Sequence, residues 1–199
     1  AEILEYLKAD CVFLYNHIVE FINLFGTHLT MAGAAMKQLK TFHEVEKITS
    51  EGIDKQFRKY YYGGRVQCIK RGILEGDFKV YDVNSMYPSV MKDFQHPISS
   101  NFISYIGKSA RAIVERCDFA RIRARNDGAL PRVVNEGTAK AKLSFEETDG
   151  EFYATGHEIR MGLKTGRLQI LDVIEAYKAN EHGTFADFID YFYSMRMKA

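Results

Sequence analysis

The chain has 199 residues, 46% of them hydrophobic and 13% aromatic, which is enough to bury the core of one or two domains. Its 27 basic and 26 acidic side chains leave a net charge of +1, which excludes a protein that grips nucleic acid by overall charge; any such site must be a local patch. No apolar run approaches membrane-spanning length and no signal peptide opens the chain, so we expect a soluble, cytoplasmic protein without a membrane partner.

Three helices are predicted in the first part of the chain. Residues 1–25 carry apolar side chains at helical spacing, and Gly26 ends the pattern. Residues 32–41 and 53–61 are expected to form the second and third helices. The third helix should end at the paired glycines that follow it.

The pattern then changes to short strands. Residues 65–73 and 78–83 both read as strands, and the turn Glu75-Gly76-Asp77 between them predicts a hairpin. Pro88 favours the first turn of a helix that continues through Phe94.

Strand-like segments dominate beyond residue 99. Residues 118–125 alternate strictly and place Arg121, Arg123 and Arg125 on one face, where they could meet phosphates, an acidic partner or only solvent. The remaining predicted elements are strands at 142–146 and 168–177, a short helix at 157–163, and a last helix at 185–197 capped by Thr184. Both ends of the chain fall inside predicted helices, so we expect a piece of a longer protein.

Asp82 is the first candidate for chemistry. It follows an apolar predicted strand and precedes a helix started by Pro88, so its carboxylate should face a cleft at the end of a sheet. A hard cation such as Mg²⁺ prefers carboxylate and carbonyl oxygens, and the carbonyl of Val83 could supply a second ligand. The alternative is an ordinary turn or cap residue.

The segment Asp82-Val83-Asn84-Ser85-Met86-Tyr87-Pro88-Ser89 resembles motif A of family B DNA polymerases, with Met86 in place of a leucine. The resemblance implies that Asp82 and Val83 bind the catalytic Mg²⁺ or Mn²⁺ ions. It implies that Tyr87 packs against the incoming sugar and excludes ribonucleotides as a steric gate. The backbone amides of Ser85, Met86 and Tyr87 would face the dNTP triphosphate, and Asn84 and Ser85 would help place the template or nucleotide.

A second motif, Tyr61-Tyr62-Gly63-Gly64, precedes motif A. Paired glycines let a backbone approach another chain closely, and basic residues surround them. One interpretation is therefore that this segment binds a single strand of nucleic acid. A helix end beside a solvated charge run is the other. The motif resembles the Tyr-x-Gly-Gly segment of protein-primed family B polymerases. That resemblance implies template binding through Tyr61, Gly63, Gly64 and Arg65, with a balance between synthesis and proofreading.

Tyr6 and Asp10 are four residues apart, hence on one face of the first helix. Such pairs are common in helices, where they usually consist of a tyrosine in the core and an exposed aspartate. In register before the other two motifs, the pair resembles the third exonuclease motif of family B proofreading domains. The resemblance implies that Tyr6 orients the attacking water and that Asp10 binds a metal.

Together these resemblances imply an α+β fold: the end of an exonuclease-type helical segment, then an incomplete family B palm with an inserted mixed α/β subdomain. The predicted parts are 1–50, the end of the 3′–5′ exonuclease domain; 51–77, linker and hairpin; 78–117, the start of the palm; 118–180, an insertion that contacts terminal protein and DNA; and 181–199, the start of a return helix.

Two family motifs are missing from the chain: Lys-x-x-x-Asn-Ser-x-Tyr-Gly, which holds the nucleotide, and Asp-Thr-Asp, which supplies the second metal carboxylate. We therefore expect the chain to be part of a protein-primed, proofreading DNA polymerase, and we expect the chain by itself to be inactive. Its expected partners are template-primer DNA, a dNTP and a terminal protein. The alternatives are a non-catalytic DNA- or terminal-protein-binding module and, less favoured, an unrelated hydrolase using Asp10 and Asp82.

Overall fold

The computed structural model describes residues 2–28, 30–45, 51–139 and 141–198. It has a mixed α/β architecture and divides into two compact units, Ala1–Val45 with Phe185–Ala199, and Glu46–Thr184. We call these the helical unit and the sheet unit and describe each by itself. The finer five-part division expected from the sequence remains a prediction.

The helical unit contains α1 (Glu2–Phe25), α2 (Met31–Phe42) and α7 (Ala186–Lys198). Gly26 ends α1 as predicted: its φ is +81°, and its amide donates to the Ile22 carbonyl at 2.8 Å. Thr30 caps α2 by accepting a hydrogen bond from the Gly33 amide at 3.0 Å. Helix α7 confirms the last predicted helix, although it begins one residue later.

Aromatic side chains of α1 and α2 pack against those of α7. The Phe42 ring lies 6.2 Å from Phe188 and 5.4 Å from Tyr191, measured between centroids, and Phe25 stacks on Phe192 at 6.0 Å. Helix α1 has no buried residue. None of the described helices is long and apolar enough to cross a membrane.

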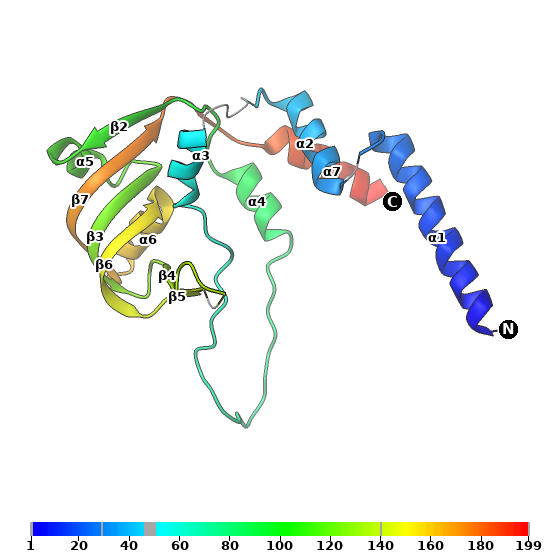
Figure 1. The fold of residues 1–199 in the computed structure, drawn as a ribbon, viewed down its shortest axis with the longest axis horizontal. Coiled ribbons are helices and arrows are strands. Elements are labelled where there is room, and N and C mark those ends of the chain that lie inside the picture. The colour runs from blue at the N-terminus through cyan, green and yellow to red at the C-terminus, as the bar shows by residue number, and fades with distance from the viewer. Residues whose placement is uncertain (1, 29, 46–50, 140, 199) are drawn as a thin grey trace. The chain divides into compact units, whose positions relative to one another are not determined.

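The sheet unit is built on four antiparallel strands (Figure 1). Their order across the sheet is β2 (Phe102–Ile106), β7 (Leu168–Ala179), β3 (Phe119–Asp127) and β6 (Glu147–Thr155). The alternation predicted for β3 is confirmed, because Ala120, Ile122 and Ala124 are completely buried. Strand β6 was not predicted: its first half is acidic and contains Gly150, and it becomes a strand by pairing with β3 along its whole length.

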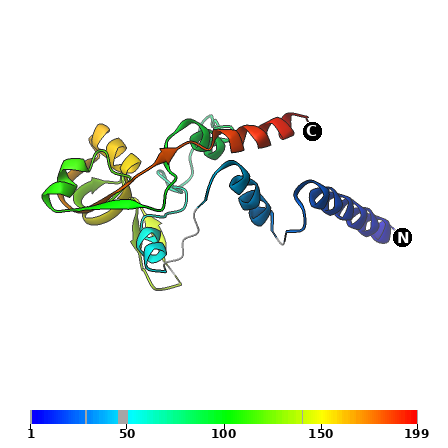
Figure 2. The same cartoon turned by 90° about the horizontal axis from the view of Figure 1, so that it is seen from above.

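Helices cover both faces of this sheet. Helices α5 (Lys108–Ile113) and α6 (Gly156–Lys164) lie on the face that buries Ile122, and Ile159 of α6 belongs to that core. Helix α3 (Glu51–Arg58) covers part of the other face (Figure 2). There Phe57 packs 5.2 Å from Phe119. Helix α6 matches its prediction, while α5 was expected to be strand-like.

Helix α6 begins with a reciprocal cap. The Thr155 hydroxyl accepts from the Glu158 amide at 3.3 Å, and the Glu158 carboxylate accepts from the Thr155 amide at 2.8 Å. Two orphan amides at the start of the helix are satisfied in this way.

Two short strand pairs complete the sheet unit. Strands β1 (His96–Pro97) and β8 (His182–Gly183) form one, and β4 (Arg132–Val134) and β5 (Lys142–Ser144) form the other. Strand β5 confirms the strand expected at 142–146, and β7 confirms the one expected at 168–177.

The predicted hairpin is wrong. Residues 61–85 form a long loop between α3 and α4 (Met86–Asp93), without a described strand (Figure 1). Val66 and Val80 are 90% and 97% exposed in it. A strand must pair its amides and carbonyls with a neighbour, and no strand among the described residues is hydrogen-bonded to this segment in a sheet. Helix α4 itself confirms the helix predicted around Pro88.

Candidate nucleic-acid interface

The Tyr61–Gly64 turn starts from a firmly anchored residue. Tyr60 is 4% exposed and packs 5.3 Å from both the Phe119 and Tyr153 rings. Burial raises the pKa of its phenol far above the usual value, with Glu175 adding to the effect. Because Tyr60 is fixed on the sheet, the residues after it leave α3 from a defined point.

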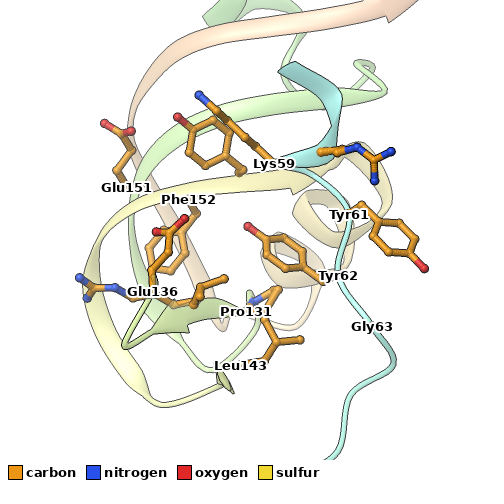
Figure 3. Close-up of a pocket in the computed structure, with 13 residues that line it drawn as sticks. Lys59, Tyr61, Tyr62, Gly63, Pro131, Glu136, Leu143, Glu151 and Phe152 are labelled. Atoms are coloured by element: carbon orange, nitrogen blue, oxygen red, sulfur yellow. The ribbon is translucent and has the colours of Figure 1, made fainter. Parts of the chain in front are cut away.

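Tyr61 and Tyr62 then point in different directions. Figure 3 shows the Tyr62 ring turned into a pocket and the Tyr61 ring turned away from it. Tyr61 is 79% exposed, so its face is available for stacking. Burial raises the pKa of Tyr62 to about 12, with smaller contributions from Glu158, Tyr153 and Glu136, so its hydroxyl remains a neutral donor at physiological pH.

The pocket beside the turn has a volume of about 810 Å³. The turn forms one wall, and strands β4, β5 and β6 with their flanking residues form the others (Figure 3). Apolar side chains and both charge signs line it, including Pro131, Leu143, Phe152, Arg58, Lys59, Arg132, Glu136 and Glu151. A site of this composition can hold an apolar ring together with a polar or charged group.

Gly63 and Gly64 are exposed, and Gly64 approaches motif A. A methyl group added to Gly64 would lie 3.1 Å from the Tyr87 hydroxyl oxygen, which is tighter than normal packing. The fold thus brings together two motifs that the sequence suggested separately. Arg65, the next residue, donates from Nη1 to the Gly128 carbonyl at 3.1 Å.

The motif A residues lie at the end of the exposed loop. Asp82, Val83 and Asn84 are exposed, and Ser85 adopts a left-handed conformation with φ +50° before α4. A left-handed backbone is uncommon for a residue other than glycine and is often found at functional positions. It turns the chain so that the first amides of α4, those of Met86 and Tyr87, start a helix with free donors.

The donors near Asp82 are of the right type for Mg²⁺ but too few. Its carboxylate and the Val83 carbonyl are hard oxygen ligands. Nowhere in the described parts of the chain do three His, Cys, Asp or Glu side chains converge on one point. The described residues around Asp82 thus offer two oxygen ligands, which by themselves do not make a two-metal centre.

Tyr6 and Asp10 lie one turn apart on α1, as the spacing predicted. Tyr6 is 67% exposed, so it is not the core tyrosine that the alternative interpretation of this pair required. The pair belongs to the helical unit, whereas Asp82 belongs to the sheet unit.

The arginine stripe of β3 lies on the face of the sheet that α3 covers only in part, and it is largely neutralised. Arg121 pairs with Glu151 at 2.5 Å and Arg125 with Asp149 at 3.6 Å, both across to β6. The register places Asp172 of β7 opposite Arg123 on the other side. This charge pattern favours a solvated ion-pair face over a phosphate-binding one.

The sequence did not indicate several of the residues that line the pocket. Tyr62 was the variable position of its motif, and Arg132 and Glu136 belong to a distant segment without a motif of its own. Only the pairing of β4 with β5 and the packing of α3 on the sheet bring these side chains together.

Three comparisons with known proteins are informative. The chain is 42% identical over 196 residues to the DNA-directed DNA polymerase of Enterobacteria phage PRD1, which covers 98% of this chain and 34% of that protein. Its fold is similar to Phi29 DNA polymerase in complexes with primer-template DNA and with single-stranded DNA. The TM-scores are 0.60 and 0.59, with 21% identity over 92% of this chain and 34% of the Phi29 chain.

The chain thus spans about a third of the length of these relatives. The family model described as DNA polymerase type B, organellar and viral, matches residues 1–199. Because that match covers every residue, the chain belongs to the organellar and viral type B DNA polymerases.

Proposed function

We propose that this chain is the part of a protein-primed DNA polymerase that carries motif A and the template-gripping turn. The observation that supports this most strongly is the approach of Gly64 to Tyr87, because it joins the two motifs in one place. In this proposal Tyr61, Gly63 and Gly64 contact the template strand. Tyr87 selects deoxynucleotides by excluding the ribose 2′-hydroxyl.

Asp82 has a defined role in the proposed reaction. Its carboxylate and the Val83 carbonyl hold Mg²⁺ or Mn²⁺, which would neutralise the triphosphate and activate the primer hydroxyl. The amides of Ser85, Met86 and Tyr87 bind the triphosphate, with Asn84 and Ser85 beside the template or nucleotide. The remaining carboxylate must come from elsewhere in the whole polymerase, so this chain alone should not extend a primer.

Two further activities belong to the same proposal. Tyr6 and Asp10 on α1 would serve 3′–5′ proofreading, with Tyr6 orienting water and Asp10 binding a metal. The insertion around the sheet would contact the terminal protein as well as DNA. The family relationship and the exposed position of Tyr6 and Asp10 support these assignments.

The test is an Asp82→Asn change in the whole polymerase. Primer extension with dNTPs and Mg²⁺ should fall by about 1,000-fold because a metal ligand is lost, while the Kd for primed DNA stays within about twofold. Asp77→Asn is the matched control, since Asp77 is an exposed aspartate in the same loop. Normal extension by the Asp82→Asn protein would overturn the assignment.

A second candidate function is a non-catalytic DNA- or terminal-protein-binding module. The observation behind it is that the described residues contain no cluster of three His, Cys, Asp or Glu side chains around Asp82. Its signature would be tight DNA or terminal-protein binding by the whole protein without any extension, unchanged by Asp82→Asn.

A further inference from the structure

The loop that follows β3 has little freedom to move. Asn126 is 2% exposed, and its side-chain oxygen accepts from the Ala129 and Leu130 amides, both at 2.9 Å. Its side-chain nitrogen donates to the Leu130 carbonyl at 3.0 Å. One buried amide thus satisfies three backbone groups, which fixes the loop.

Gly128 at the tip of this loop is also constrained. Its φ is +66°, and an added methyl group would lie 2.5 Å from the Phe145 carbonyl oxygen. Only glycine tolerates that combination without a shift of the backbone. The Gly128 carbonyl is therefore a rigidly held acceptor on the sheet unit.

Arg65 uses this acceptor. Its Nη1 donates to the Gly128 carbonyl at 3.1 Å, and its guanidinium carbon lies 4.4 Å from the centre of the Phe145 ring. Arg65 directly follows Gly64, so the contact fastens the glycine turn to the fixed loop within one residue.

The Nε/Nη2 edge of the guanidinium is occupied as well. Nε and Nη2 of Arg65 both donate to the Gln67 side-chain oxygen, at 3.1 and 2.5 Å. Arginine grips a phosphate in a bidentate manner through two neighbouring N–H groups of this kind. With Gln67 on that edge and Gly128 on Nη1, three of the five N–H groups of Arg65 are directed at the protein itself.

We infer that Arg65 is a positioning residue: it holds the Tyr61–Gly64 turn on the loop at Gly128 and Phe145, and it does not contact DNA. This replaces the role that the resemblance implied for Arg65, and it rests on the proposed template contact of the turn. The consequence is that the sheet unit sets where the template strand is gripped.

The test uses the whole polymerase with Arg65→Ala, and Arg116→Ala as matched control. Arg116 is an exposed arginine of the sheet unit, and its side chain forms no hydrogen bond or ion pair with a described residue. For Arg65→Ala we expect the KM and Kd for primed template to rise about 3- to 10-fold, the loss of one hydrogen bond and one exposed cation–π contact, with kcat within about twofold. Arg116→Ala should leave all three values within about twofold.

The salt dependence of the Kd separates positioning from phosphate binding. A positioning role leaves the slope of log Kd against log salt unchanged in Arg65→Ala. A lost phosphate contact would reduce that slope by about 0.9, and this result would overturn the inference. Arg65→Lys should lose as much affinity as Arg65→Ala, because lysine keeps the charge but not the three directed bonds; recovery of affinity by lysine would also overturn it.

A double-mutant cycle with Phe145→Leu tests the contact itself. If Arg65 acts through Phe145, the combined variant should bind about as weakly as Arg65→Ala alone, whereas multiplied effects would contradict the inference. These binding measurements need no catalysis. A wild-type protein that binds primed DNA but never extends it would defeat the proposed function and leave the role of Arg65 decided by the salt slope and the cycle.

Discussion

Strand β3 and the loop at residues 61–85 differ in how completely their apolar side chains are covered. Ala120, Ile122 and Ala124 of β3 are 0% exposed, whereas Val66 and Val80 of the loop are 90% and 97% exposed. Strand β3 has a neighbour on each side, and the loop has none among the described strands. An apolar sequence is thus not enough: the apolar side chains are buried in the segment that pairs with neighbouring strands and exposed in the segment that does not.

The largest expected difference between the two regions concerns stability. Phe152 of β6 is 2% exposed, so Phe152→Ala should lower the free energy of unfolding of the chain by about 3–5 kcal/mol through lost burial and a cavity. Val80→Ala in the loop should change it by less than about 0.5 kcal/mol. Urea unfolding followed by circular dichroism measures both, and a comparable loss for Val80→Ala would mean that the loop is packed in solution.

Cysteine reactivity compares the two regions without changing the fold. Cys117 is 1% exposed and burial raises its pKa to about 11, so at pH 8 it remains a covered thiol, whereas Cys68 in the loop is exposed. Iodoacetamide should modify Cys68 at least about 100-fold faster, read by peptide mass spectrometry. In urea the two rates should converge; similar rates in the native protein would contradict the comparison.

The smallest effect tests a local feature of the sheet unit. Thr155→Ala removes the cap of α6 and should lower the free energy of unfolding by about 1 kcal/mol, because the Glu158 amide loses its acceptor. Thr155→Ser retains the hydroxyl and is the control, with a change below about 0.5 kcal/mol. Equal losses in the two variants would show that packing of the threonine methyl group, and not the cap, stabilises this end.

Elements with a strong local pattern of apolar and polar residues could be predicted from the sequence. Helix α1 follows from apolar spacing with Gly26 at its end, and β3 follows from strict alternation. Strand β6 and the failed hairpin could not be predicted, because each depends on whether a distant segment supplies hydrogen bonds. In the candidate site the motif residues were recognisable, but the approach of Gly64 to Tyr87, the pocket and the contact of Arg65 with Gly128 arise from tertiary packing.

The approach of Gly64 to Tyr87 has a consequence for fidelity. A larger residue at Gly64 would place its Cβ 3.1 Å from the Tyr87 hydroxyl oxygen and would push that hydroxyl aside by a few tenths of an ångström. In the proposed polymerase, the segment that binds the template strand would lie directly beside the ring that contacts the sugar of the nucleotide. A change in the template-binding segment would then alter how strongly Tyr87 excludes ribonucleotides.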